Sequence, residues 1–313
     1  MGVEDFAIEN GVLARYKGAG GDVAIPEGVR RIGAFAFCGC ESLKTISIPE
    51  GVTEIGASAF YGCSFLESAT IPEGVKKIGE GAFNGCSSLE SVAIPEGVKK
   101  IGFCAFAGCR SLKTISIPEG VAEIGEDAFR DCSSLESVTI PEGVREIGAF
   151  AFCGCKSLGS ISISEGVKKI GGNAFRGCPS LARVIVLGEA LPKGFAIGPD
   201  TALVSPHLST NAAKGKRISK ASIAAGRVIY ALENPGHDLD DATRKYIRAQ
   251  LPGVCKALRY DAAAILWIAD NGLVSGAAAA KAATACTEKG LTEAAAALLD
   301  ASAASKKKSK LEL

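Results

Sequence analysis

The sequence predicts a right-handed α/β solenoid of about eight coils with a parallel sheet, followed by a small all-α domain. Isoleucine recurs every 23 residues from Ile25 to Ile163, and Val186 occupies the next step. Four further apolar columns keep the same register, and they begin at Ile32, Phe37, Cys40 and Leu43. Because the period has no insertions, each side chain stacks on its equivalent in the next coil, and the columns form a continuous core. The helical domain is predicted from about Ser209, where the composition changes to Ala, Lys and other helix formers.

Each coil is expected to contain a strand, a turn and a compact return. Ile46 and Ile48 alternate with hydroxyl residues, which is the period-two pattern of a strand with one buried face. Pro49 ends the strand because proline has no N–H to donate, and the Glu-Gly pair after it suits a turn. A short helical turn is expected at residues 59–63 of the return.

The outward strand positions form the candidate binding surface. Stacked strands lie about 4.8 Å apart, so eight coils give a face roughly 35 Å long, the scale of a protein or peptide footprint. Serine and threonine also suit any exposed strand, so a purely structural role stays open. The face has no aromatic anchor of the kind that dominates strong interfaces. The candidate contact residues are Thr45, Ser47, Ser68, Thr70, Ser91, Thr114, Ser116, Ser137, Thr139, Ser160 and Ser162.

Charged residues also recur with the 23-residue period. The acidic column consists of Glu27, Glu50, Glu73, Glu96, Glu119, Glu142 and Glu165. Cations recur near it at Arg30, Arg31, Lys76, Lys77, Lys99, Lys100, Arg145, Lys168 and Lys169. Like charges about 5 Å apart repel, so columns of opposite sign are expected to form a solvated zipper.

The repeat unit I-P-E-G-V-x-x-I-G-x-x-A-F-x-G-C-x-S-L-x-x-V-x resembles the BspA-type bacterial leucine-rich repeat. The resemblance covers about residues 1–208, and residues 6–24 are similar to the leader segment that often opens such arrays. It implies a leucine-rich-repeat superhelix and a role in protein–protein contacts or adhesion, often at bacterial surfaces. A non-enzymatic scaffold with a protein or peptide partner is therefore expected, and a surface adhesin is the alternative.

The start of the chain has no cationic segment followed by an apolar run, and no stretch is apolar enough to span a bilayer. As written, the protein is expected to stay in the cytoplasm. A chain from which a signal had been removed would look the same, so a secreted or cell-surface location is the alternative.

Catalytic and metal chemistry have little support in the residues. Seven of the twelve cysteines occupy one repeat position, and buried free thiols are the expected outcome. No metal or other cofactor is expected, because no histidine lies in the array and the extra pairs are Cys-x-Cys. An enzyme built around His237, Asp238 and Asp240 is the least favoured hypothesis, since these residues also suit a helix cap.

The domain prediction places a cap at residues 1–24, the solenoid with a degenerate closing repeat at 25–208, a helical domain at 209–305 and a disordered basic tail at 306–313. No nucleic-acid partner is expected from so short a basic run. Breaks are expected at residues 234–236, 251–253, 271–272 and 290, which leaves four or five helices. Residues 262–304 weakly resemble ankyrin-type helix pairs. The helices could cap the solenoid or form a second binding module, and the oligomeric state stays open.

Overall fold

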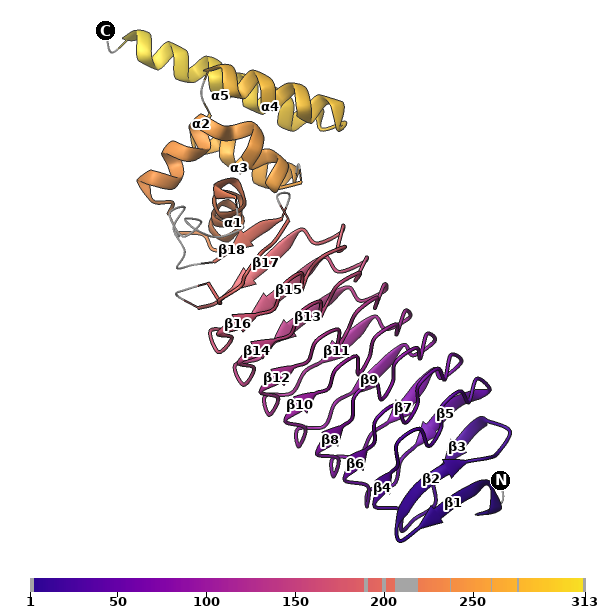
Figure 1. Ribbon diagram of the computed structural model, residues 1–313. Helices are drawn as coiled ribbons and strands as arrows, with labels where there is room; N and C mark the ends of the chain where they lie inside the picture. Colours follow the sequence, from indigo (N-terminus) through magenta and orange to yellow (C-terminus); the bar gives the residue numbers. More distant parts are fainter. Residues whose placement is uncertain are drawn as a thin grey trace. The chain divides into compact units, whose positions relative to one another are not determined.

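The computed structural model describes residues 3–188, 191–198, 201–205, 219–236, 238–259, 261–274 and 276–311. Its contacts divide the chain into two compact units. The first consists of residues Met1–Leu181 with Pro192–Ala196, and the second of Ala182–Leu191 with Ile197–Leu313. The parallel solenoid and the helical region predicted from the repeat are both confirmed (Figure 1).

The longer strands of the first unit form a parallel sheet with one strand per coil. The register between neighbouring strands is 23 residues, so Thr45 pairs with Ser68 and Ser68 with Ser91. Strict repetition in the sequence therefore becomes strict stacking in space. These strands are β3 (Gly21–Ala24), β5 (Leu43–Ser47), β7 (Ser68–Thr70), β9 (Ser91–Ala93), β11 (Thr114–Ser116), β13 (Ser137–Ile140) and β15 (Ser160–Ile163).

A second sheet, made of two-residue strands, runs along the other side of the coils. Its strands are β4 (Arg31–Ile32), β6 (Glu54–Ile55), β8 (Lys77–Ile78), β10 (Lys100–Ile101), β12 (Glu123–Ile124), β14 (Glu146–Ile147) and β16 (Lys169–Ile170). At its N-terminal end, β2 (Val12–Tyr16) pairs with β4, and β1 (Phe6–Glu9) pairs antiparallel with β2 after the short helix η1 (Val3–Asp5).

A stack of aromatic rings forms the central column of this core. The phenylalanines from Phe37 to Phe175 lie with ring centroids 5.0 to 6.0 Å apart and nearly parallel planes. Tyr16 continues the stack beyond Phe37 at 5.0 Å, and Phe6 follows it at 5.2 Å. The leader residues therefore cover the first coil by extending its own column, which keeps the first ring from water.

The expected helical turn in each return is replaced by successive tight turns. In the second coil, the N–H of Ala59 donates to the carbonyl of Gly56, and the N–H of Cys63 donates to the carbonyl of Phe60. Other amides in the same segment bond across coils, as Phe37 N–H does to the Ala59 carbonyl at 2.7 Å. A helix would keep its hydrogen bonds within one segment, so bonding between coils excludes it here.

Glycine at the end of each short strand allows this close stacking. A Cβ atom placed on Gly79 would lie 2.6 Å from the backbone nitrogen of Ala57 in the preceding coil. No side chain fits at that separation, so the invariant glycine of the repeat is explained by backbone contact.

The second unit combines two strands with five helices. Its elements are β17 (Arg183–Val186), β18 (Ala202–Val204), α1 (Lys220–Glu233), α2 (Asp241–Ala257), α3 (Ala262–Asp270), α4 (Gly276–Glu288) and α5 (Thr292–Leu311). Gly226 in α1 lies directly against the backbone of Leu203 in β18. Arg183 pairs with Glu233 at 2.6 Å and with Asp261 at 3.7 Å. These contacts explain why the last strands group with the helices, whereas the repeat pattern places a boundary near residue 208.

Three of the four predicted helix breaks are confirmed, because α1, α3 and α4 end just before Asn234, Asn271 and Lys289-Gly290. The fourth break, predicted at residues 251–253, lies one residue earlier, because Gln250 has a non-helical backbone with φ −126° and ψ 29° that divides α2 into two helical segments. The ring of Pro252 clashes with the preceding turn, which explains why regular helix geometry is interrupted just before it. Helix α5 reaches Leu311, so the basic segment predicted as a tail has a helical backbone up to that residue.

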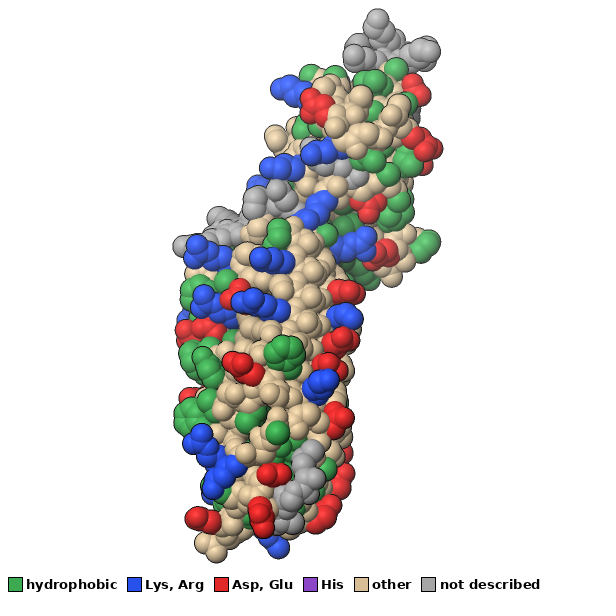
Figure 2. Space-filling model, turned by 90° about the vertical axis from the view of Figure 1, so that its right-hand side faces the viewer, with side chains coloured by type: hydrophobic (Ala, Val, Ile, Leu, Met, Phe, Trp, Pro, Cys, Tyr) green, Lys and Arg blue, Asp and Glu red, His purple; other side chains and the backbone are tan. Residues whose placement is uncertain are grey.

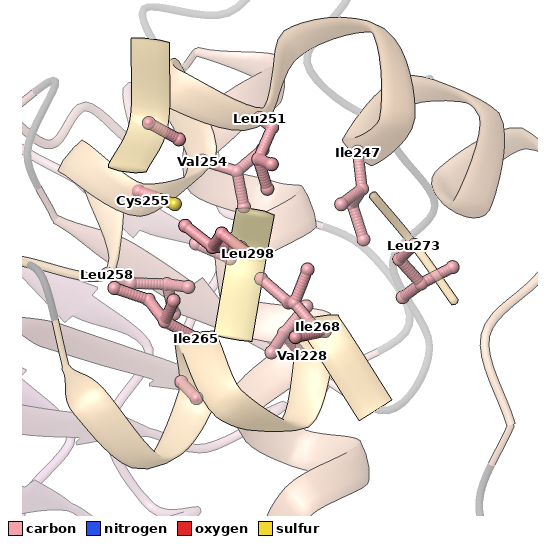
Figure 3. Packing of buried hydrophobic residues seen from close by; sticks show 14 of the residues in the cluster. Val228, Ile247, Leu251, Val254, Cys255, Leu258, Ile265, Ile268, Leu273 and Leu298 are labelled. Atoms are coloured by element: carbon pink, nitrogen blue, oxygen red, sulfur yellow. The ribbon is translucent and has the colours of Figure 1, made fainter. Parts of the chain in front are cut away.

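A single apolar cluster holds the second unit together, and Figure 3 shows side chains from several helices pointing toward one another in it. Trp267 is partly buried and packs against the cluster, as favoured by its place in an apolar helix. Within the described residues, no helix is long and apolar enough to cross a membrane. The labelled members of the cluster are Val228, Ile247, Leu251, Val254, Cys255, Leu258, Ile265, Ile268, Leu273 and Leu298.

Candidate interaction surface

The eleven predicted contact residues lie on one face of the longer-stranded sheet, which we call the hydroxyl face. Eight of the eleven side chains are exposed, while Thr45, Ser160 and Ser162 are half-buried. The alternate residues, such as Ile46 and Ile115, point into the core. The period-two pattern in each strand thus places the hydroxyls outside and the aliphatic side chains inside.

Two columns of hydroxyls run across the strands. The first column pairs Thr114 with Ser91 on one side and with Ser137 on the other. In the second column, Ser47 pairs with Thr70, and Thr139 pairs with Ser162. Between Thr45 and Ser160 the first column spans about 24 Å at the usual strand spacing. Small side chains that both donate and accept hydrogen bonds let an extended partner approach closely.

One hydroxyl at the N-terminal end already has a partner within the chain. The Thr45 hydroxyl donates to the carboxylate of Asp22 on β3 at 2.8 Å. Asp22 occupies the same register position on the neighbouring strand. The hydroxyl face therefore ends at a negatively charged residue.

Exposed aromatic side chains stand on the turns, away from the strand positions considered in the sequence. Phe35 and Phe65 are about 60% exposed (60% and 59%), and Tyr61 and Phe103 are also exposed. Figure 2 shows one face of the molecule on which hydrophobic side chains stand among scattered acidic and basic residues. The four exposed aromatic residues could have been found in the sequence as departures from the repeat, because each replaces a small or polar residue found in other coils.

The predicted zipper between the acidic column and the cations is not found among the described residues, and charges instead pair within another column. Ion pairs join neighbouring coils on the second sheet, at 2.8 Å for Glu54–Lys77, 2.7 Å for Lys100–Glu123 and 2.5 Å for Glu146–Lys169. In the part of the chain that the structure describes, the Pro-Glu-Gly glutamates take part in none of these pairs. Strand register sets residues at the same repeat position side by side, so charges of opposite sign pair within one column. Exposed pairs of this kind contribute about 0–1 kcal/mol each.

Two of the three residues in the enzyme hypothesis, Asp238 and Asp240, have structural roles. Asp240 caps α2 by accepting hydrogen bonds from the N–H and hydroxyl of Thr243 at 2.8 and 2.9 Å. Burial opposes its charged form, but the bonds from Thr243 and the nearby Arg227 cation hold the pKa of Asp240 below its ordinary value. Asp238 pairs with Arg244. His237 and His207 lie outside the described residues. Among the described side chains, no group of three could hold a metal ion.

The repeat cysteines form an internal thiol ladder of Cys40, Cys63, Cys86, Cys109, Cys132, Cys155 and Cys178. All are free thiols, and the five from Cys63 to Cys155 are buried. From Cys63 onward, each S–H donates to a phenylalanine carbonyl 26 residues earlier, as Cys63 does to Phe37 at 3.1 Å. Burial raises the pKa of Cys63 and of Cys132 to about 12. Buried thiols in the ladder thus serve as small apolar residues with one satisfied donor.

Comparison with known proteins identifies the repeat. The family described as BspA type Leucine rich repeat region matches in six copies, over residues 16–134 and 77–190. No curated protein matches the chain. A solved leucine rich repeat protein of T. pallidum shares 31% identity, with 62% of this chain and 83% of that chain covered and a TM-score of 0.44. A leucine rich cell surface protein of Faecalibacterium prausnitzii shares 25% identity, with 72% and 78% covered and a TM-score of 0.42. The matched repeats span more than half of the sequence, and the chain therefore belongs to the BspA-type leucine-rich-repeat family.

Proposed function

We propose that this protein is a non-enzymatic scaffold that binds a protein or peptide partner across the hydroxyl face. The observation that carries the proposal is an array of eleven small hydroxyl side chains on six stacked strands, eight of them exposed, which only Ala93 interrupts. A face of this length matches a macromolecular footprint.

Small side chains would let the partner come close to the sheet, while the hydroxyls replace the hydrogen bonds that the partner gives up to water. We therefore expect large side chains on this face to block partner binding. Thr114 and Ser137 lie side by side on neighbouring strands near the middle of the face. Arginine at both positions would cover the neighbouring hydroxyls without entering the core.

The test uses the double variant Thr114→Arg/Ser137→Arg and a matched control, Thr53→Arg. Thr53 is exposed on the other side of the coil, and its equivalents in other coils include Arg30 and Lys76. Partners are captured from host extracts and identified by mass spectrometry. We expect the double variant to lose a partner that wild type and control both retain. Equal capture by all three folded proteins would exclude the hydroxyl face as the contact surface.

The thiol ladder supports a site of action in a reducing compartment, because unpaired cysteines persist where thiols are kept reduced. A role at the cell surface is the alternative that the family allows. Cell fractionation of the host with an antibody against the chain separates the two. Recovery with surface proteins after washing would overturn the reducing-compartment proposal.

A further inference from the structure

A surface hollow lies beside the N-terminal hairpin of the first unit, at the end of the second sheet where β1, β2 and β4 are neighbours (Figure 1). Its volume is about 610 Å³. Two of its lining residues are arginines, which are exposed and follow one another in the chain. The polar residues of the lining are Glu9, Asn10, Arg30, Arg31 and Thr53.

Backbone hydrogen bonds fix the two arginines against the hairpin turn. Asn10 and Gly11 have φ values of 51° and 75°, as a type I′ turn requires. The Gly11 carbonyl accepts from the N–H of Arg30 at 2.7 Å and from the N–H of Arg31 at 3.2 Å. The Arg30 carbonyl accepts in turn from the N–H of Thr53 in the next coil at 2.9 Å. The backbone under both guanidinium groups is therefore held in place before any ligand arrives, which lowers the entropy cost of binding.

Arg31 is the odd member of the column in which the ion pairs of the second sheet form. In register it lies between Val12 and Glu54, and the Glu54 carboxylate is already engaged by Lys77 at 2.8 Å. Within the described residues, neither Arg30 nor Arg31 takes part in an ion pair. The other six members of the column form the pairs Glu54–Lys77, Lys100–Glu123 and Glu146–Lys169.

The type of cation at this place also differs from the rest of the array. Arg30-Arg31 is the only pair of consecutive arginines in the sequence, and residues 76–77, 99–100 and 168–169 at the same repeat positions are lysine pairs. Arginine presents a planar fork of N–H donors that matches the oxygens of a phosphate, whereas lysine acts as a point charge. A phosphate monoester carries about 1.5–2 negative charges and three acceptor oxygens at neutral pH, so it can use two guanidinium groups at once. A single carboxylate would leave much of that charge and many of those donors unused.

We propose that this hollow binds the phosphoryl group of a phosphate monoester, with Arg30 and Arg31 as its charged donors. The side-chain amide of Asn10 offers a neutral donor in the same lining. The volume exceeds that of a phosphate ion and leaves room for the organic group that carries it. Glu9 acts in the opposite direction, because its carboxylate repels the anion. The site belongs to the second sheet and does not depend on the hydroxyl face being the contact surface for a protein.

Isothermal titration calorimetry of the full-length protein with O-phosphoserine tests the proposal. We expect saturable binding, with free serine giving none. Inorganic phosphate, titrated separately, should bind more weakly than O-phosphoserine, and tighter binding of inorganic phosphate would replace the monoester with the free ion as ligand. Glutamate tests the carboxylate alternative, and an affinity equal to that of O-phosphoserine would overturn the phosphate class.

Variants of the lining residues locate the binding. Arg30→Gln/Arg31→Gln should weaken O-phosphoserine binding by about tenfold or more, since both charged donors are lost. Glu9→Gln should tighten binding about two- to fivefold, because it removes a like charge from the lining. Lys168→Gln/Lys169→Gln is the matched control, which removes the same charge from the same repeat positions at the far end of the array and should keep the affinity. Unchanged affinity in the arginine variant, or an equal loss in the lysine control, would overturn the site.

Discussion

Phe35 is a bulky residue held in the left-handed region of the backbone, and replacing it tests how much strain the repeat tolerates. Its φ is 58°, and the equivalent residues Ser58, Cys104 and Asn173 have φ values between 52° and 60°. The turn in each coil thus requires this conformation whatever the side chain. Asparagine, which tolerates it well, already occupies the position at residue 173. Phe35→Asn should therefore remove strain without changing the turn.

The magnitude follows from comparing Phe35→Asn with Phe65→Asn. The two phenylalanines are 60% and 59% exposed, and Phe65 lies outside the left-handed region. Each substitution gives up about 1 kcal/mol of burial, since full burial of a phenylalanine stabilises by about 1.5–3 kcal/mol. A strained non-glycine residue costs about 1–3 kcal/mol, and only Phe35→Asn recovers part of this. Phe35→Asn should accordingly be about 1 kcal/mol more stable than Phe65→Asn.

Urea unfolding followed by far-ultraviolet circular dichroism measures this difference. Both variants have the same composition and nearly the same burial change, so the shift between their midpoints isolates the backbone contribution. Equal midpoints, or a lower midpoint for Phe35→Asn, would refute the claim that the left-handed position is strained for phenylalanine.

Three further predictions concern the core and the helical unit. Phe106→Ala removes a fully buried ring with a neighbour on each side and should lower the unfolding free energy by about 3–5 kcal/mol. Phe6→Ala, at the end of the stack, should cost less, and equal losses in urea unfolding would contradict a continuous column. Gly79→Ala should destabilise by about 1–3 kcal/mol in the same assay, because its Cβ would meet the Ala57 backbone, whereas Gly172→Ala, with open space around its Cβ, should not. Asp240 has a folded pKa below its unfolded value, so its stabilising effect is present above the unfolded pKa and is lost as pH falls through the folded pKa. Asp240→Asn keeps the cap but should flatten this acid dependence of the melting temperature of the helical unit, and an unchanged slope would argue against it.

The repeat made the interior of the solenoid predictable, because each buried position is written six or seven times at a constant spacing. Ile46, Phe60 and Leu66 are buried because each belongs to an apolar column that stacks from coil to coil. The strands follow from the alternation of apolar and hydroxyl residues along the chain. The return segment was less predictable. Its apolar spacing suits a helical turn, but hydrogen bonds between coils depend on neighbours that a single repeat does not reveal.

The helical unit shows the opposite limit of sequence reasoning. Its breaks at Asn234 and Asn271 were visible because glycine or proline follows and no packing opposes an end there. Pro252 marked a real interruption, which lies at Gln250, but the sequence did not show that Leu251 and Val254 beyond it pack into the same core as the other helices. Packing of that kind depends on neighbours distant in the sequence, which a local breaker signal does not reveal.

The departures from the repeat carry information about specificity that the repeat itself cannot carry. A column that is identical in every coil is satisfied by stacking alone, as the thiols from Cys63 to Cys132 are by their carbonyl acceptors. Phe35, Tyr61 and Phe65 gain nothing from the stack, because they are exposed. Stability of the fold does not require an aromatic side chain at these positions, since other coils carry small or polar residues there. These departures therefore direct mutagenesis to the irregular turns as well as to the regular hydroxyl face.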